Sequence, residues 1–476
     1  MNNKTYLTTS IPYVNAAPHI GYALEVVQAD TIARYKRLIG TDIFFTSGSD
    51  ENSLKNVRAA EKEGISTKEL VDKYAQDFEK LKNKNVLNIS YDVFNKTSEE
   101  HHFLGAQKLW SLCKKEDIYK KSYTGLYCVG CEEFYTPDEL IDGKCPEHKT
   151  VPEKVEEENY FFKLSNYQKQ IESLIENDNL KILPQTRKNE VLSFIKSGLR
   201  DFSISRSQER AKGWGVPVPD DPTQIMYVWF DALTTYLTAI GFGTDEKLFK
   251  KYWTGDVEKI HIIGKGIIRF HAVYWIAMLL SANLPLPDVE FVHGYVTVDG
   301  QKISKSLGNT ISPFDITQKY GTDVVRYYLL KEIPPGADGD FSERRLAEIY
   351  NSDLANGLGN LVARVSKLAE NNDVEISDKI EELEPHVKTL LDDYNFNEAL
   401  QFIWGIISIV DHEINKSKPW ELTGDEAKKV ISELAHTVVV IATNLQPFLP
   451  ETSEKILKQF RGKIKSAEPL FPRLSA

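Results

Sequence analysis

The first third of the chain alternates between short apolar segments and longer amphipathic ones. The segment "TYLTTS" at residues 5–10 is rich in β-branched and aromatic residues, which is typical of a buried strand. In "HIGYALEVVQADTIARYKRLIG", residues 19–40, apolar residues recur at helical spacing and Gly40 stands where a C-terminal cap is expected. A second strand-like segment, "DIFFTSGSD", precedes "STKE" at 66–69, the pattern of a capping box. Strand, helix, strand and helix in this order predict a parallel sheet with helical crossovers.

This alternation is interrupted by a stretch rich in Gly, Cys, Pro and charge, and then resumes at "IHIIGKGIIRFHAVYWIAMLLSANLPLPDVEFVHGYV". Gly becomes sparse from residue 343, where amphipathic helical segments such as "EAKKVISELAHTVVVIATNL" follow one another. We therefore expect an α/β fold with a Rossmann-type parallel sheet that an insertion splits, followed by a C-terminal helical bundle. The predicted divisions are the first half-sheet, the insertion, the second half-sheet, a connecting region and the bundle, at residues 1–115, 116–224, 225–298, 299–342 and 343–476.

Composition places the chain among ordinary globular proteins, with 476 residues, 41% hydrophobic and 27% charged. No apolar stretch approaches the roughly 18 residues of a membrane span, and the start "MNNKTYLTTS" lacks a signal peptide's apolar core, so we expect a cytoplasmic protein. The net charge of −11 argues against general adhesion to nucleic acids. Residues 181–212 nevertheless carry eight Lys and Arg against three Asp and Glu, which fits a solvated helix face or a nucleic-acid contact equally well.

The cysteines have the most specific spacing in the chain. Cys128 and Cys131 form a C-x-x-C pair, and Cys145 with His148 forms C-x-x-H after thirteen intervening residues. Two such pairs can close a tetrahedral S3N site around zinc, whereas a redox C-x-x-C needs no second pair. Four protein ligands leave no open position for substrate, so the predicted zinc site is structural. Cys113 has no partner in this pattern and is expected to be buried.

Two separated segments carry candidate phosphate ligands. In "APHIGYALE", His19 and Gly21 follow a strand and open a helix, where backbone N–H groups and the helix dipole favour an anion. That signal alone is weak. The segment "DGQKISKSLGNT", residues 299–310, adds Lys302 and Lys305 on a loop bracketed by Gly300 and Gly308. Two cationic elements on one sheet could hold a triphosphate from opposite sides.

These segments resemble the HIGH and KMSKS signatures of class I aminoacyl-tRNA synthetases. The resemblance is to the methionyl-tRNA synthetase family and extends over almost the whole chain, in "IPYVNAAPHIGY", "SGSDENSLK", "GLYCVGCEEFYTPDEL", "MYVWFDALTTY", "HIIGKGIIRFHAVYW", "VHGYVTVDGQKISKSLGN", "NGLGNLVAR" and "KPW". It implies that methionine is activated with ATP and then transferred to the terminal adenosine of tRNA(Met), with Mg²⁺ accompanying ATP. A monomer is expected, because no appended oligomerising domain is evident.

The resemblance also assigns candidate residues to each substrate. The ATP-binding and catalytic set is His19, Gly21, Tyr22, Lys302, Ser304, Lys305 and Ser306. Lys302 and especially Lys305 would meet the charge that develops on the departing pyrophosphate, which raises the chemical rate. Asp50 would pair with the α-amino group of methionine, and aromatic walls suit its polarizable sulfur. The methionine-binding set is Ile11, Tyr13, Asp50, Trp229, Ala232, Tyr236, Phe270, His271 and Trp275.

On the bundle, the resemblance implies that Asn360, Arg364 and Trp420 bind anticodon bases. Asn360 and Arg364 are four apart on one predicted helix face, and Trp420 follows Pro419 at a helix junction. Unstacked loop bases are recognised by edge contacts and aromatic platforms, so these residue types suit the role. Spacing alone would equally suit a helix-capping Asn and a surface Arg.

Besides Ile303, which conservatively replaces the methionine of the second signature, three positions depart from the family's pattern. Tyr22 replaces the second histidine of the first signature, Asn52 stands where His is usual, and Gly266 stands where an acidic residue is usual. A phenol donates a hydrogen bond but carries no positive charge at neutral pH. The departures leave two hypotheses open: a working enzyme of a divergent branch, or a tRNA-binding protein with weak or no amino-acid activation.

Overall fold

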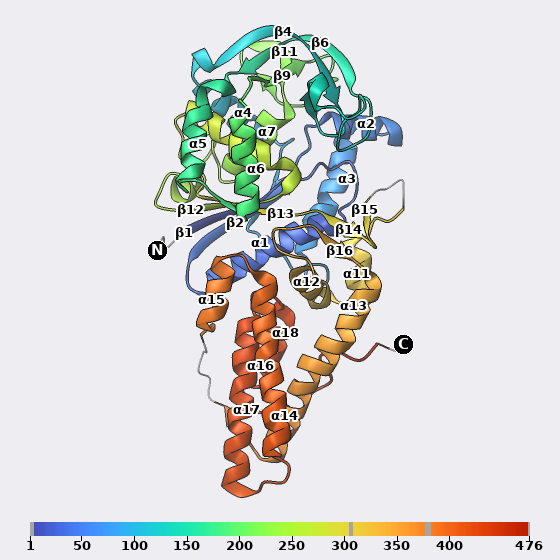
Figure 1. Ribbon diagram of the computed structural model, residues 1–476, viewed down its shortest axis with the longest axis vertical. Helices are drawn as coiled ribbons and strands as arrows, with labels where there is room; N and C mark the ends of the chain where they lie inside the picture. The colour runs from blue at the N-terminus through green and yellow to red at the C-terminus, as the bar shows by residue number, and fades with distance from the viewer. Residues whose placement is uncertain (1–3, 304–307, 377–381, 475–476) are drawn as a thin grey trace. The chain divides into compact units, whose positions relative to one another are not determined.

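The computed structural model describes residues 4–303, 308–376 and 382–474, which form two compact units (Figure 1). The first unit comprises Met1–Pro18, Thr41–Lys80 and Tyr91–Val292. The second comprises His19–Gly40, Leu81–Ser90 and His293–Ala476. Each unit is therefore assembled from segments that are distant in sequence.

A six-stranded sheet forms the centre of the first unit. Its order is β3 (Val93–Lys96), β2 (Asp42–Ser49), β1 (Lys4–Thr9), β12 (Glu258–Gly264), β13 (Val289–His293) and β7 (Lys181–Leu183). The pairs β3–β2, β2–β1, β1–β12 and β13–β7 are parallel, which confirms the predicted Rossmann-type α/β class. The strand order reverses direction between β1 and β12. In such sheets, ligands bind beyond the carboxyl ends of the strands at this switch point.

Helices of the first unit agree with the amphipathic segments of the sequence. The predicted capping box at Ser66 and Glu69 is present at the start of α3. Between Phe270 and Trp275 the chain forms a π-helix (η6), a conformation that is rare and frequently marks functional sites. The α-helices of this unit are α2 (Leu54–Glu63), α3 (Thr67–Glu79), α4 (Glu100–Leu112), α5 (Gln168–Glu176), α6 (Gln185–Lys196), α7 (Val228–Leu233), α8 (Thr235–Thr238), α9 (Lys247–Tyr252) and α10 (Ile276–Ser281).

The stretch predicted as an insertion contains two small sheets, labelled in the upper part of Figure 1. One has the order β5 (Glu133–Tyr135), β4 (Ile118–Cys128), β6 (Glu153–Phe162) and β8 (Phe202–Ser203), and its pairs are antiparallel. The other has the order β10 (Pro217–Val218), β11 (Asp221–Met226) and β9 (Ser205–Ser207). Between β6 and β8 in the sequence, β7 leaves the stretch and joins the edge of the parallel sheet.

The second unit begins with α1 (Ile20–Leu38), which lies against α12 (Thr322–Lys331) and β14 (Val296–Val298). Asp30 of α1 and Arg326 of α12 form an ion pair of 2.7 Å in which both side chains are fully buried. Arg326 also donates to the backbone carbonyls of Leu87, Pro447 and Phe448, so one guanidinium joins three segments of this unit. A small sheet of this unit has the order β15 (Gln301–Lys302), β14 and β16 (Gly339–Phe341).

The predicted helical bundle is confirmed, and α16 and α17 run side by side in it (Figure 1). Tyr350–Gly359 is a second π-helix (η8) that leads directly into α14. The other elements are α11 (Pro313–Tyr320), α13 (Glu343–Ile349), α14 (Asn360–Asn371), α15 (Pro385–Asp392), α16 (Phe396–Ser417), α17 (Gly424–Leu445), α18 (Pro450–Gln459) and the strand pair β17 (Glu375–Ile376) with β18 (Gly462–Lys463). Among the helices the structure describes, none is both long and apolar enough to cross a membrane.

Candidate functional site

His19 caps the N-terminus of α1. The backbone N–H of Gly21 donates to His19 Nδ1 at 3.1 Å, so the neutral ring carries its proton on Nε2. No acidic residue stands in the first turn of the helix, so the helix itself supplies no carboxylate to offset the positive end of its dipole. Nε2–H and the helix end are both suited to a phosphate oxygen.

The lysine segment lies against this same helix end. A Cβ atom at Gly21 would be 3.7 Å from Ile303 Cδ1, so Ile303 is next to the first turn of α1. On the other side of the loop, Ile311 accepts a 3.0 Å hydrogen bond from the N–H of Ile20. Lys302 lies at the end of β15, and its carbonyl accepts from Asn309 Nδ2 at 3.1 Å. The structure thus brings His19, Gly21 and Lys302 into one neighbourhood, while the predicted residues Ser304, Lys305 and Ser306 fall outside the described residues.

In the first unit, Tyr13 and Asp50 lie side by side beyond the ends of β1 and β2. They are paired as an isolated parallel bridge, and the Asp50 N–H donates to the Pro12 carbonyl at 2.9 Å. The Tyr13 hydroxyl and Asp50 Oδ1 are buried without a hydrogen-bond partner within the described chain. Burial raises the pKa of Asp50 well above its usual range, and the charges of Asp231 and Glu132 raise it further. A buried carboxyl with one oxygen left unpartnered is suited to an ammonium group.

Aromatic residues predicted to line the pocket are brought together by α7, α8 and the π-helix η6. Trp229 and Phe270 stack face to face, with ring centroids 3.7 Å apart and planes within 7°. His271 Nδ1 lies 2.9 Å from the Ile267 carbonyl, which only accepts, so the neutral ring leaves Nε2 to accept from the Tyr236 hydroxyl at 2.6 Å. The Trp275 indole nitrogen is buried and has no described partner. Ala232 is buried on α7, and Ile11 is half-buried after β1.

Charged residues that no sequence pattern indicates surround the candidate methionine-binding residues. The Lys55 ammonium lies 4.0 Å from the centre of the Tyr13 ring, and burial lowers the pKa of Lys55. Glu132 is fully buried; its carboxylate accepts from the Lys55 N–H at 3.2 Å and from Arg206 at 3.3 Å. The Glu132 carbonyl accepts from the Trp229 indole at 3.2 Å. Glu132 therefore ties the aromatic wall to the Arg206 guanidinium and to the backbone of Lys55, a link that only long-range contacts reveal.

The four predicted metal ligands, Cys128, Cys131, Cys145 and His148, gather in the insertion, and one ligand atom from each lies within 4.8 Å of every other. Cys131 Sγ is 3.4 Å from Cys145 Sγ and 3.2 Å from His148 Nδ1. Three sulfurs and one imidazole nitrogen at these separations fit a tetrahedral metal ion, so the donor set matches the group. Cys113 is buried at the C-terminal end of α4 and does not belong to this cluster.

Asn360 and Arg364 lie on α14 directly after the π-helix η8. Asn360 is exposed, and Arg364 donates to Asp411 at 3.3 Å and to Asn415 at 3.1 Å, both on α16. Trp420 follows α16, and 54% of its surface is exposed. An exposed indole and an exposed amide on one bundle provide a stacking platform and a hydrogen-bonding edge.

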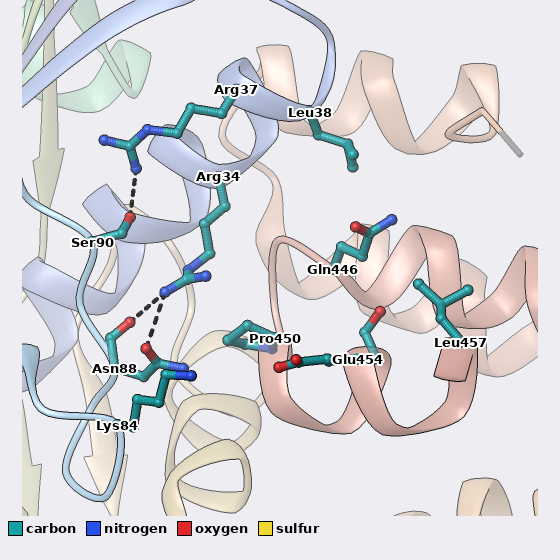
Figure 2. A pocket seen from close by; sticks show the side chains of 11 residues that line it. Arg34, Arg37, Leu38, Lys84, Asn88, Ser90, Gln446, Pro450, Glu454 and Leu457 are labelled. Carbon is teal, nitrogen blue, oxygen red and sulfur yellow. Dashed lines mark hydrogen bonds between the residues drawn. The ribbon is translucent and has the colours of Figure 1, made fainter. Parts of the chain in front are cut away.

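A separate cavity of about 600 Å³ lies within the second unit (Figure 2). Arg34 donates to the Asn88 carbonyl at 2.5 Å and Arg37 donates to the Ser90 hydroxyl at 2.6 Å, while Glu454 lies on the opposite wall. These arginines fasten residues 81–90 to α1, and Arg34 also pairs with Asp30. None of the predicted site residues lines this cavity, and its two arginines already have structural roles.

The three departures have distinct surroundings. Tyr22 lies in the first turn of α1, where its N–H donates to the His19 carbonyl at 3.0 Å. Asn52 Nδ2 donates to the Thr97 carbonyl at 2.8 Å, so Asn52 is part of the wall after β2. Gly266 is in the short turn that follows β12. Each lies next to a predicted ligand segment.

Comparison with protein-family models gives two matches. A model described as tRNA synthetases class I (M) matches residues 5–151 and 135–366. A model described as the anticodon-binding domain of tRNA ligase matches residues 373–475. The two models together span the catalytic and bundle regions, and Trp420 falls within the second.

Curated proteins and solved structures agree with these models. The methionine–tRNA ligase of Thermotoga maritima is 42% identical over 480 residues, covering 96% of this chain and 75% of that protein. The methionine–tRNA ligase of Brucella suis is 41% identical and covers 99% of this chain and 98% of that protein. Mycobacterium tuberculosis methionyl-tRNA synthetase, solved in complex with methionyl-adenylate, superimposes with a TM-score of 0.91 at 36% identity, covering 99% of this chain and all of that one.

Proposed function

The chain belongs to the methionyl-tRNA synthetase family of class I tRNA synthetases, and we propose that its residues carry out that family's two-step reaction as follows. The protein activates methionine with ATP to methionyl-adenylate and releases pyrophosphate. It then transfers the methionyl group to the 3′-terminal adenosine of tRNA(Met) and releases AMP. Both attacking oxygens belong to substrates, so the protein supplies positioning and charge stabilisation and no nucleophile.

One observation carries the activation step: the His19 cap and the segment around Lys302 meet at the N-terminus of α1. His19 Nε2–H and the positive end of the α1 dipole bind the phosphates of ATP, and Gly21 admits them at close range. Tyr22 supplies a hydroxyl to the same group. Lys302 and Lys305, with Ser304 and Ser306, oppose the charge that develops on the leaving pyrophosphate. Mg²⁺ accompanies ATP and is held mainly by the phosphates.

Methionine is bound in the first unit. Asp50 pairs with its ammonium group, and the Tyr13 hydroxyl donates to one of its polar groups. The thioether lies among the aromatic residues, with Ile11 and Ala232 completing the apolar surface. Trp229 and Phe270 are in direct ring contact, so a side chain that enters between them must displace one ring. The bond between Tyr236 and His271 orients the phenol at the same wall.

The metal bound by Cys128, Cys131, Cys145 and His148 is a structural zinc ion. Zinc would crosslink the segments on either side of β5 in a region with few core residues. These four side chains hold it without an open position, so it takes no part in the transfer of the methionyl group.

For tRNA, Asn360 and Arg364 hydrogen-bond to anticodon bases, and Trp420 stacks on one of them. The bonds from Asp411 and Asn415 fix the Arg364 guanidinium at the surface of the bundle. The partners of the protein are thus ATP, L-methionine and tRNA(Met). We expect a monomer in the cytoplasm, and light scattering that gave a stable dimer mass would contradict the first expectation.

The experiment that tests this function is ATP–pyrophosphate exchange with single amino acids in the presence of Mg²⁺. Exchange should require methionine and be at least about tenfold slower with leucine, isoleucine, valine or cysteine. The Lys305→Ala variant should exchange at least about tenfold more slowly than the wild type. Affinity for tRNA without methionine-dependent exchange would instead indicate a tRNA-binding protein that does not activate amino acids.

A further inference from the structure

His102 of α4 connects two short helices that lie beside the candidate methionine pocket. Its Nε2–H donates to Asp231 Oδ1 at 2.5 Å, and its Nδ1 is hydrogen-bonded to the Thr238 hydroxyl at 2.8 Å. The side chains of His102 and Asp231 are 0% and 1% exposed. Asp231 belongs to α7 and Thr238 ends α8, so one imidazole bonds to both helices.

The two helices are too short to be held in place by their own backbone. α7 has six residues and α8 has four, and helices of this length have little stability of their own. They carry Trp229, Ala232 and Tyr236, three of the residues assigned to methionine. Side-chain contacts with neighbouring elements must therefore determine where this wall of the pocket lies.

The position of His102 is itself tightly fixed. Gly105 lies one turn further along α4, and a Cβ atom there would be 2.3 Å from Thr238 Cγ2 and 2.7 Å from the Phe242 carbonyl oxygen. The absence of a side chain at Gly105 lets α4 approach α8 this closely. On the other side, Asn95 donates to the hydroxyls of Thr235 and Thr238 at 2.8 and 3.1 Å. The bonds of His102 thus belong to a buried side-chain network that also includes Asn95 and Thr235.

We propose that His102 is a positioning residue for methionine binding: it holds α7 through Asp231 and α8 through Thr238, and so sets the distance between Trp229 and Tyr236. This proposal rests on the proposed function, because it assigns methionine to that pocket. His102 also keeps the Asp231 carboxylate in a fixed place near Asp50, the predicted partner of the ammonium. Loss of the bond to Asp231 is therefore expected to weaken methionine binding and to leave ATP binding unchanged.

Two amide substitutions of His102 distinguish its bond to Asp231 from its bond to Thr238. The amide of His102→Gln extends to the place of Nε2 and can still donate to Asp231, whereas the shorter amide of His102→Asn reaches only the place of Nδ1. The control is Leu109→Ala, which removes a fully buried side chain from the same helix that makes none of the network's hydrogen bonds. For each variant, the KM values for methionine and ATP are measured by exchange, and methionine affinity is measured by tryptophan fluorescence.

The expected result is a rise of about tenfold in the methionine KM for His102→Asn, with the ATP KM within about twofold of wild type. His102→Gln should stay within about threefold for both substrates, and Leu109→Ala should lower the unfolding temperature with little change in either KM. An unchanged methionine KM in His102→Asn, or an equal rise in Leu109→Ala, would overturn the proposal.

If His102→Asn does not fold, Thr238→Val provides a second test. It removes the bond to α8 at nearly constant volume and should raise the KM for methionine but not that for ATP; an unchanged KM for methionine would overturn the proposal. Wild-type exchange serves as the separate test of the proposed function, because its loss would refute that function whatever the variants do.

Discussion

The side chain of Ile303 lies against Gly21, with its Cδ1 atom 3.7 Å from the place that a Cβ atom at Gly21 would occupy. Ile303 immediately follows Lys302, and Gly21 is within the cap formed by His19. Two segments that are almost 300 residues apart in the sequence are therefore neighbours at one helix end. A triphosphate at this helix end can contact both segments, as the proposed activation step requires.

Gly21 is the first place where this arrangement can be tested. A Cβ atom at Gly21 would be 2.9 Å from His19 Cε1 and 3.0 Å from Nδ1, so Gly21→Ala must displace the His19 ring. We expect the kcat/KM for ATP to fall by about 10- to 100-fold, because a displacement of this size disrupts a catalytic contact. The melting temperature should change little, since the better helix propensity of Ala offsets the weakened cap.

The matched control is Gly405→Ala on α16, where a Cβ atom would meet no atom within 4 Å. This variant should retain wild-type exchange and have equal or slightly greater stability. If Gly21→Ala kept normal ATP kinetics, the cap of α1 would not be the phosphate site.

Asp50→Asn should improve stability and impair methionine binding. Burial raises the pKa of Asp50 in the folded protein above its unfolded value of 3.8. The folded state then binds more protons than the unfolded state between the two pKa values, so the ionised carboxylate destabilises the fold increasingly as the pH rises through this range. Removing the charge should therefore raise the melting temperature at neutral pH, and the gain should disappear below about pH 4, where Asp50 is protonated in both states. The KM for methionine should rise by about 10- to 100-fold.

Asp42→Asn is the control, because the pKa of Asp42 is shifted in the opposite direction to that of Asp50. Hydrogen bonds from Lys251 and Tyr252 lower the pKa of Asp42, so its charge favours the fold at neutral pH. This substitution should leave the melting temperature unchanged or slightly lower, with normal methionine kinetics. Calorimetry between pH 4 and 8 compares the two variants, and a lower melting temperature for Asp50→Asn at pH 7 would contradict the assignment of a buried, unpaired carboxylate.

The metal cluster predicts a selective effect of cysteine substitution. Cys145→Ser should lower the zinc content of the purified protein well below one ion per chain and lower its melting temperature, because a structural metal contributes directly to folding. Cys113→Ser, outside the cluster, should keep its zinc. Metal analysis by mass spectrometry measures both, and full zinc retention by Cys145→Ser would exclude Cys145 as a ligand.

The bundle residues should affect only the second step. Trp420→Ala and Arg364→Ala are expected to raise the KM for tRNA about tenfold in the aminoacylation assay, since base stacking contributes about 1–3 kcal/mol per base. Methionine-dependent exchange in the absence of tRNA should be unchanged. Ile409→Ala removes another exposed side chain, from α16, and should change neither activity. Equal loss of tRNA affinity in all three variants would indicate a nonspecific effect on the bundle.

Local pattern predicted much of the fold correctly. The helix from residue 20, the capping box at Ser66 and the strands at 4–9 and 42–49 all depend on short-range spacing, and the structure contains them. The cysteine spacing likewise predicted the metal-ligand cluster, because the two pairs are close in sequence and a short connecting segment brings them together. By contrast, β7 is three residues long and is embedded among helices and antiparallel strands, so periodicity could not place it in the parallel sheet.

The polar network behind the pocket could not be predicted in this way. His102 bonds to Asp231 across 129 residues, and Lys55 bonds to Glu132 across 77. Neither pairing leaves a local signature, because a lone His or Glu in an amphipathic segment is most simply a surface residue. The π-helices around His271 and before Asn360 were also unpredicted, since a single extra residue per turn hardly changes the apolar period.

The central claim, that the His19 cap and the lysine segment act on one ATP, is tested most directly by a double-mutant cycle. His19→Asn preserves the cap, since an Asn oxygen can accept from the Gly21 N–H, and it removes the Nε2 donor. The kcat/KM for ATP in methionine-dependent exchange is measured for His19→Asn, for Lys302→Ala and for the double variant that combines them. The account predicts a coupling energy of at least about 1 kcal/mol, with the double variant losing less than the product of the two single effects. Losses that multiply to within about 0.3 kcal/mol would show that the two segments act independently and would contradict the account.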